Sequence, residues 1–277
     1  MRGKMTEVLD NIKSDFYDTY LSIKFELRKH YRRNRIQMAV VLALFLASVF
    51  YVVPTLWNMG LADTAEEFAS TNLSFVNLLI IISGALFAGD VVSSEFENQT
   101  GLILFPTPQN HNSIFVGKYI ASAMVTLSVV TIYYTVTAIE IQYIYGLFGI
   151  ATEFIKSYLF SILYMFGAIS LIFFFSSILK RSITSTLLGF FSLMMIFPIF
   201  EAVLTMVEVE PWFLLSYYEG FITDVLDGVV STGFGPRSRE FAAGFAPDFY
   251  HGIYVILGYT IFLFILGLYF ANKRRME

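Results

Sequence analysis

The feature of this sequence that most constrains its fold is a set of long apolar runs without a charged residue. Six such runs occur, at 36–56, 73–89, 119–139, 157–179, 182–200 and 249–272. A helix that crosses a bilayer needs about 20 predominantly apolar residues. Because lipid offers no hydrogen-bond partners to the backbone, and because the runs lack the alternation of a membrane barrel, helices are the expected form. The sequence therefore predicts an all-α integral membrane protein with six transmembrane helices.

The composition agrees with lipid as the solvent. Hydrophobic residues make up 56% of the 277 positions and charged residues 14%, against roughly 45–50% and about 25% in soluble domains. The chain has no cysteine, which excludes disulfides, thiolate metal sites and cysteine nucleophiles. The first 35 residues lack the apolar core of a secretory signal peptide, so the first span is expected to direct insertion.

The basic residues predict the orientation, because lysine and arginine are retained on the cytoplasmic side of short loops. With the N-terminus inside, 15 of the 18 basic residues are cytoplasmic, and only Lys156, Arg237 and Arg239 lie outside. We therefore expect a multi-pass protein of the cell membrane with both termini in the cytoplasm. The predicted organisation is a cytoplasmic N-terminus (1–35), one six-helix transmembrane domain (36–272) and a short cytoplasmic tail (273–277).

The segment before the first span carries apolar residues at spacings of three and four among basic ones. These residues are Phe16, Tyr20, Ile23, Leu27 and Tyr31. The spacing predicts an amphipathic helix within 14–35 that lies along the inner leaflet as an interfacial connecting helix. An ordinary basic tail that is attracted to anionic lipid is the alternative.

The connection between the fifth and sixth spans, 206–248, is acidic yet rich in apolar residues. Its apolar run is interrupted by Glu219, Asp224 and Asp227, and each charge would cost about 2.5–3.5 kcal/mol at the bilayer centre. The pattern predicts an external helical hairpin, re-entrant or interfacial, with its turn in the Gly- and Pro-containing stretch 231–236.

The loop between the second and third spans, 90–118, predicts a short cytoplasmic helix over 94–105. Ser94 and Glu97 have the spacing of a capping box, and Pro106 and Pro108 prevent continuation of the helix. This helix would present apolar side chains to a cytoplasmic partner, namely Phe96, Leu102, Ile103 and Phe105. The alternative is a connector that rests on the membrane surface.

The same loop resembles the signature region of ABC-2-type permeases, the membrane subunits of a class of ABC exporters. The residues that carry the resemblance are Asp90, Glu95, Thr100-Gly101, Pro106, Pro108 and Gly117-Lys118. The six-span layout extends the resemblance over nearly the whole chain. Members often have an arginine shortly before the Gly-Lys pair, where this chain has His111, so no role of that arginine is carried over.

The resemblance implies that two such permeases, identical or homologous, pair, and that the short helix docks into a separate ATPase subunit, which holds ATP and Mg. The implied ATPase-coupling residues are Glu95, Phe96, Glu97, Thr100, Gly101, Leu102 and Phe105. The residues themselves agree that this chain is not an ATPase. Gly117-Lys118 is followed by Tyr119 and lacks the preceding glycine of a phosphate-binding loop. No cofactor of its own is expected.

Two acidic residues near the predicted outer ends of spans three and five, Glu140 and Glu201, are candidates for a substrate pathway or for proton transfer. The alternative is that both reach interfacial water. An ion-coupled secondary transporter that uses Glu140 or Glu201 is therefore the second functional hypothesis, and a membrane scaffold for a cytoplasmic partner is the third. The three scattered histidines show no metal-ligand spacing, and the basic N-terminus beside a span favours lipid over nucleic acid.

Overall fold

The computed structural model describes residues 2–58, 60–99, 110–146, 151–227 and 248–274, and within these ranges it is helical and contains no strand. Six helical stretches are long and apolar enough to cross a membrane. They are Arg35–Trp57, Ala65–Glu97, His111–Ile144, Thr152–Ile178, Ser182–Met206 and Phe249–Lys273. The prediction of six helices that could cross a membrane is thereby confirmed, and the chain is a multi-pass membrane protein.

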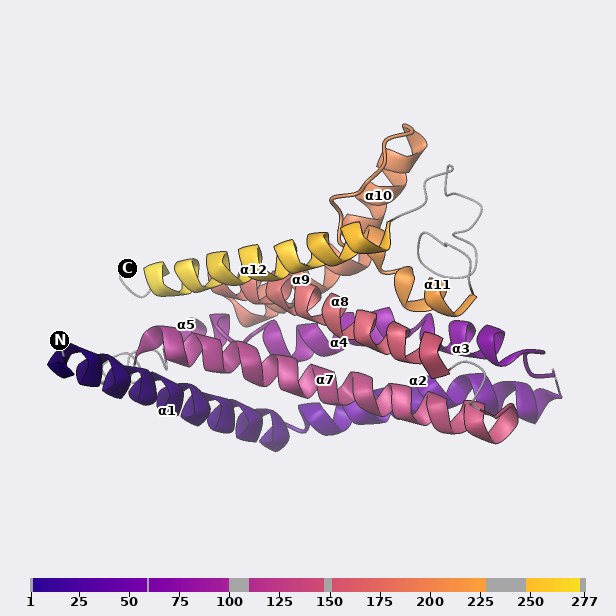
Figure 1. Ribbon diagram of the computed structural model, residues 1–277, viewed down its shortest axis with the longest axis horizontal. Helices are drawn as coiled ribbons and strands as arrows, with labels where there is room; N and C mark the ends of the chain where they lie inside the picture. Colours follow the sequence, from indigo (N-terminus) through magenta and orange to yellow (C-terminus); the bar gives the residue numbers. More distant parts are fainter. Residues whose placement is uncertain (1, 59, 100–109, 147–150, 228–247, 275–277) are drawn as a thin grey trace.

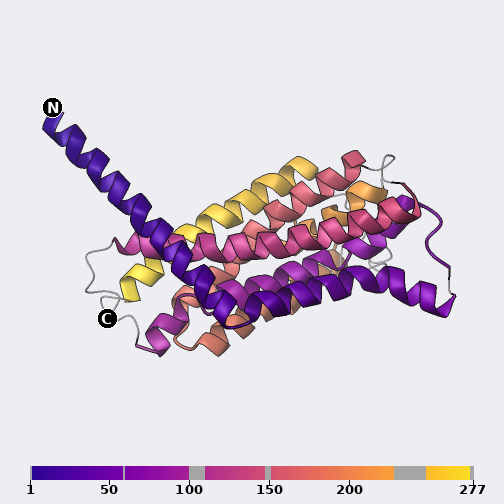
Figure 2. The ribbon, with the colours of Figure 1, turned by 90° about the horizontal axis from the view of Figure 1, so that it is seen from below.

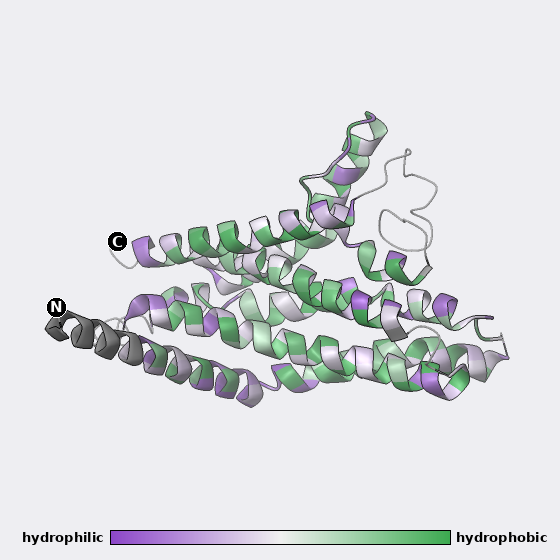
Figure 3. Ribbon diagram, viewed as in Figure 1, coloured by the Kyte–Doolittle hydropathy of each residue, from purple (hydrophilic) through white to green (hydrophobic). Residues whose placement is uncertain are grey.

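The helices run side by side along the long axis of the molecule, with both termini at the same end (Figure 1). In chain order they are α1 (Arg2–Arg32), α2 (Arg35–Trp57), α3 (Ala65–Leu73), α4 (Val76–Ala88), α5 (Ser93–Glu97), α7 (His111–Ile144), α8 (Ala151–Ile178), α9 (Ser182–Phe191), α10 (Phe197–Met206), α11 (Phe221–Asp227) and α12 (Phe249–Arg274). Hydrophobic residues dominate the long helices (Figure 3). Helices α4, α7 and α8 form the centre of the bundle, where most side chains are buried.

The outer helices show how the chain uses lipid as solvent. On α2, Ala39, Ala43 and Ala47 are buried at spacings of four residues, while Val41 and Phe45 on other faces are exposed. Small side chains at such spacings let membrane helices approach closely. Exposing the large apolar side chains of α2 to water would be unfavourable, whereas contact with lipid is favourable.

The second span is longer than its uncharged run and is broken. It starts with α3, where the Thr64 hydroxyl caps the helix by accepting from the Glu67 amide at 3.2 Å. Acidic side chains in a first turn are favourable because the helix N-terminus is positive. Glu66 and Glu67 therefore lie within α3 and do not mark the end of the span. A break at 74–75 then separates α3 from α4.

The fifth span contains a π-helical turn, η2 (Ser192–Ile196), between α9 and α10. Single π-helical turns within α-helices commonly accompany a local irregularity or a functional site. Beyond it, Pro198 lies in the first turn of α10. In Figure 1, α10 projects away from the other helices.

The loop helix α5 is shorter than predicted, and its capping box is absent. Helix α5 begins at Ser93 after Val92 without a side-chain cap, so Ser94 lies inside the helix. It ends at Glu97, and Gln99 has a left-handed backbone with φ of 55°. The prediction of one continuous helix over 94–105 is therefore wrong at both ends. Residues 100–105 lie outside the described residues.

The connection after α10 folds back along the bundle. Its described part holds a 3-10 turn, η3 (Ser216–Tyr218), and the short α11, which packs on α8 and α3. The predicted turn at 231–236 lies outside the described residues. The predicted helical hairpin includes Trp212 to Tyr218, but the chain there is mostly irregular. Side chains of this stretch form local hydrogen bonds instead, and the Tyr218 hydroxyl donates to the Trp212 carbonyl at 2.7 Å.

Candidate functional site

A buried lysine connects three helices at the end of the bundle where the termini lie. Lys118, in the second turn of α7, is 4% exposed. Its Nζ donates to Glu26 Oε2 of α1 at 2.9 Å and to Glu95 Oε1 of α5 at 2.7 Å. Burying an ion is favourable only when it is paired and hydrogen-bonded, and Lys118 has two carboxylates. We call Lys118, Glu26 and Glu95 the lysine clamp.

Helix α1 reaches the clamp because it turns its polar face toward α7. Ser22, Glu26 and His30 recur every four residues, and Ser22 Oγ donates to the Ile114 carbonyl at 2.9 Å. The opposite faces carry exposed aromatic rings, with Phe16 75% and Tyr20 60% exposed. The N-terminal part of α1 extends beyond the other helices (Figure 2). An apolar face turned away from the bundle suits contact with lipid.

Charge and burial fix the protonation of the α1 side of the clamp. Burial alone would raise the pKa of Glu26, but Lys118 and Lys29 outweigh it and lower that pKa to about 2. Burial lowers the pKa of His30 to about 4, against the opposing influence of Glu26. His30 is fully buried and meets the Phe87 ring edge-on, with ring centroids 5.2 Å apart. At neutral pH, Glu26 is therefore charged and His30 is neutral.

A second ion pair joins the start of the first span to the end of the second. The two guanidinium nitrogens of Arg35 donate to the two carboxylate oxygens of Asp90 at 2.8 and 2.7 Å. The same guanidinium also donates to the Leu86 carbonyl at 2.8 Å. Bidentate pairs of this kind fix orientation as well as add energy. The residue Asp90, which the sequence motif singled out, thus fastens α2 to the end of α4.

Helix α5 is also attached to the fourth and fifth spans. The Glu97 carboxylate accepts from the Ser182 amide at the start of α9 at 2.8 Å. The Ser176 hydroxyl of α8 accepts from the amides of Val92 and Ser93 at 3.0 and 3.2 Å. Short α5 is therefore bonded directly to three other helices, α7, α8 and α9, and is linked to α1 through Lys118.

The predicted ATPase-coupling residues fall into two groups. Glu95 points inward to Lys118, Phe96 is half-buried against the core, and Glu97 is exposed while it caps α9. The others lie outside the described residues, and these are Thr100, Gly101, Leu102 and Phe105. The described members thus share one short helix, and two of the three hold that helix in place.

The two predicted pathway residues are not brought together. Glu140 accepts from Asn72 Nδ2 at 3.3 Å, within a polar group that also includes Tyr133, whose hydroxyl donates to Asn72 Oδ1 at 2.8 Å. Glu201 is buried on α10 and lies close enough to Glu219 for the two carboxyl groups to interact electrostatically. Each acidic residue therefore belongs to a separate polar group of the bundle.

Sequence reasoning missed the partners of the motif. Lys118 is bonded to Glu26, and Asp90 is bonded to Arg35. The sequence predicts only a basic amphipathic helix for the segment that holds Glu26, and Arg35 enters only the count of basic residues. A signal for Glu26 was present, because Ser22, Glu26 and His30 form a polar stripe at helical spacing on a helix whose other faces are aromatic. Asn72, Asn77 and Glu219 were also missed, and nothing local in the sequence distinguishes them from other polar residues.

Comparison with protein families gives one match and supports a transport role. Residues 22–209 match the model of the ABC-2 family transporter protein, which is more than half of the chain. The comparison with curated proteins finds no match. Within the described residues, no group of three or more His, Cys, Asp or Glu side chains could hold a metal ion. The matched family is one of membrane permeases that do not themselves hydrolyse ATP. The chain therefore belongs to the ABC-2 family of transporters, as a membrane component.

Proposed function

We propose that the chain is the permease subunit of an ABC exporter and that a separate ATPase subunit drives it through α5. The observation that carries this proposal is the attachment of α5. This five-residue helix is bound to α7 and α1 through the lysine clamp and to α9 through Glu97. A force applied to α5 would therefore act on several spans at once rather than on a loose loop.

The orientation follows from the same proposal. The termini and α5 share one end of the bundle (Figure 1), and the ATPase with its ATP and Mg binds that end in the cytoplasm. Helix α1 then lies along the inner leaflet of the cell membrane through its aromatic face, and the 206–248 connection forms the hairpin at the external end. A second copy of the chain, or a homologous permease, completes the transport pathway, to which Glu140 and Glu201 contribute.

The two other hypotheses are less well supported. An ion-coupled secondary transporter would need a free carboxylate that moves protons, whereas Glu140 is engaged by Asn72. A scaffold without transport would not be expected in a transporter family. The family match and the attachment of α5 both favour the ATPase-driven permease.

The test is to reconstitute the permease with an ABC ATPase from the same organism that co-purifies with it, and to compare Phe96→Ala with the wild type. Phe96 is the described apolar side chain on α5 that takes no part in the lysine clamp. We expect Phe96→Ala to weaken association with the ATPase and to lower the stimulation of ATP hydrolysis several-fold. The control is Tyr143→Ala, a 79% exposed residue near the other end of α7, which should change neither. Equal association of wild type and Phe96→Ala would contradict the proposal.

A further inference from the structure

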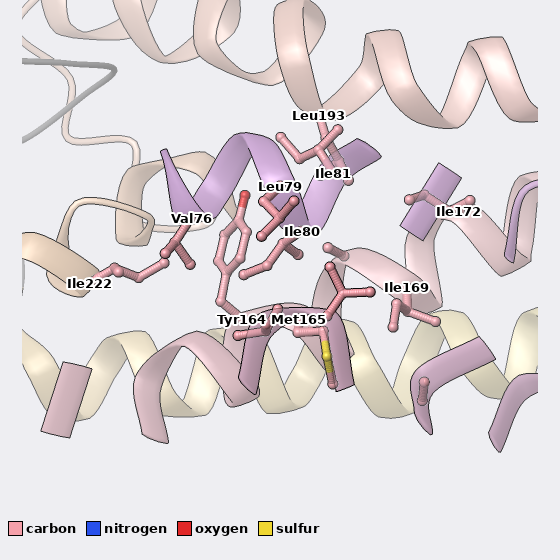
Figure 4. Packing of buried hydrophobic residues seen from close by; sticks show 14 of the residues in the cluster. Val76, Leu79, Ile80, Ile81, Tyr164, Met165, Ile169, Ile172, Leu193 and Ile222 are labelled. Atoms are coloured by element: carbon pink, nitrogen blue, oxygen red, sulfur yellow. The ribbon is translucent and has the colours of Figure 1, made fainter. Parts of the chain in front are cut away.

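A buried carboxyl group stands out in the connection between the fifth and sixth spans. Glu219 follows η3, outside the membrane-spanning helices and beyond the part of the chain that matches the family. It is 7% exposed. Asn77 Nδ2 of α4 donates to Glu219 Oε2 at 2.5 Å, and the Tyr164 hydroxyl of α8 donates to the same oxygen at 3.4 Å. Figure 4 shows Tyr164 rising from α8 toward α4 beside Val76 and Leu79.

Among the described residues, this carboxyl group has no balancing cation. Across the described ranges, neither Glu219 nor Glu201 forms an ion pair with a lysine, arginine or histidine. The titratable groups that face Glu219 are Glu201 from α10 and Tyr164 from α8, and α4 contributes the neutral Asn77. Two neighbouring buried carboxylates cannot both stay ionised without a large cost, so one of them is expected to hold a proton.

An independent observation on Asn77 indicates which one. Asn77 is 6% exposed, and its Oδ1 has no hydrogen-bond partner among the described residues, although its Nδ2 is bound to Glu219. An ionised carboxylate only accepts hydrogen bonds and has no donor for an amide oxygen. A protonated carboxyl has one O–H donor, so a proton on Glu219 would place a donor beside this unpartnered acceptor.

We propose that Glu219 and Asn77 form a proton-binding site that holds the 207–227 segment against α4 and α8. One proton from water binds the Glu219 carboxylate, and no other group changes its charge. The neutral acid then bonds with the Asn77 amide and the segment stays docked. When the proton leaves, a buried negative charge remains next to Glu201, and the segment separates from the bundle.

The environment of Glu219 supports the direction of this change. Burial, and after it the Glu201 carboxylate, raises the pKa of Glu219 to about 8. A group whose pKa is raised in the docked state stabilises docking at low pH, and that stabilisation is lost as pH rises through the raised pKa. Docking should therefore weaken as pH rises from the ordinary pKa of a glutamate, 4.5, to the raised pKa of about 8.

The experiment uses the full chain in lipid nanodiscs and two readouts. Infrared difference spectra over a pH titration detect the carbonyl band of a protonated carboxylic acid, and Glu219→Gln should remove one such band. Hydrogen exchange over 207–227 should rise with pH more steeply in the wild type than in Glu219→Gln, which is neutral and keeps the bond to Asn77. Comparing the two proteins at each pH removes the intrinsic pH dependence of exchange.

Two further variants sharpen the outcome. Glu208→Gln changes an exposed carboxylate of the same segment and should behave as the wild type in both readouts. Glu201→Gln removes the neighbouring charge and should shift the transition to lower pH. The proposal is overturned if Glu219→Gln removes no acid band, or if exchange over 207–227 in the wild type responds to sodium or potassium at constant pH rather than to pH.

Discussion

At the scale of single residues, Lys118 shows how a buried charge can hold an assembly of helices together. It lies between Glu26 and Glu95, which come from positions 92 and 23 residues away in the chain. Attraction between such groups is largely offset by the cost of removing them from water, so the intact clamp adds little net stability. Its importance is geometric, because Lys118 bonds both carboxylates and so joins α1 to α5 through α7.

Lys118→Met is therefore expected to be strongly destabilising. It leaves the partly buried Glu95 without Lys118 and the buried Glu26 with only Lys29, whose Nζ lies 2.6 Å from Glu26 Oε1, and breaking a buried pair in this way costs about 3–5 kcal/mol. Thermal unfolding of the detergent-solubilised protein, followed by size-exclusion chromatography, measures the effect. The matched control is Lys24→Met on exposed α1 surface, which should shift the midpoint little. Similar midpoints for the two variants would show that Lys118 is not a clamp.

Residues of the site could be predicted where they lie close together in the sequence, and not where they lie far apart. The motif in 90–118 identified Asp90, Glu95 and Gly117-Lys118 because they belong to one stretch of sequence. The partners Glu26 and Arg35 lie 92 and 55 positions from the residues they bind. Such pairs depend on how helices pack, and a single sequence contains no local pattern that reports it.

At the scale of helices, the contact of α1 with α7 depends on a glycine. A Cβ built on Gly117 would lie 2.6 Å from Ser22 Cβ and 2.8 Å from the Thr19 carbonyl oxygen of α1. Backbone atoms cannot move aside without displacing the helix. Gly117 therefore sets how closely α1 approaches, and with it the position of Glu26 beside Lys118.

Gly117→Ala should push α1 away from α7. Overpacking of this kind costs typically about 1–3 kcal/mol, and the shift would also lengthen the bond between Glu26 and Lys118. Limited proteolysis of α1, together with the unfolding midpoint, measures both effects. Gly258→Ala on α12 is the control, because a Cβ there meets nothing within 4 Å and alanine is the better helix former. Faster cleavage of α1 in Gly258→Ala than in Gly117→Ala would contradict this account.

The helices themselves were largely predictable, and the reasons for the exceptions are physical. Length and hydropathy are sufficient to find a span, because lipid requires both. They do not find its ends, as the acidic first turn of α3 and the early start of α7 at His111 show. The break between α3 and α4 and the π-helical turn at 192–196 depend on packing against neighbouring helices rather than on local composition.

At the scale of the whole molecule, the end of the bundle that holds the termini differs chemically from the rest. The end with the termini holds paired charges, in the lysine clamp and in the bond between Arg35 and Asp90. Farther from that end, Glu201 and Glu219 are acidic groups without cations among the residues that the structure describes. Paired charges thus surround α5, where we propose that the ATPase binds, and the unpaired carboxyl groups lie farther from it.

The most direct test of the central claim is to locate the ATPase contact by cross-linking. Because the chain has no cysteine, Asn98→Cys places a single thiol on the exposed surface directly after α5, and Tyr143→Cys places one near the other end of α7. In the reconstituted complex, a bifunctional reagent should join the thiol at position 98 to the ATPase and leave the thiol at position 143 unreacted with it. Cross-linking from position 143, or from neither position in a complex that hydrolyses ATP, would contradict the proposal that α5 receives the ATPase.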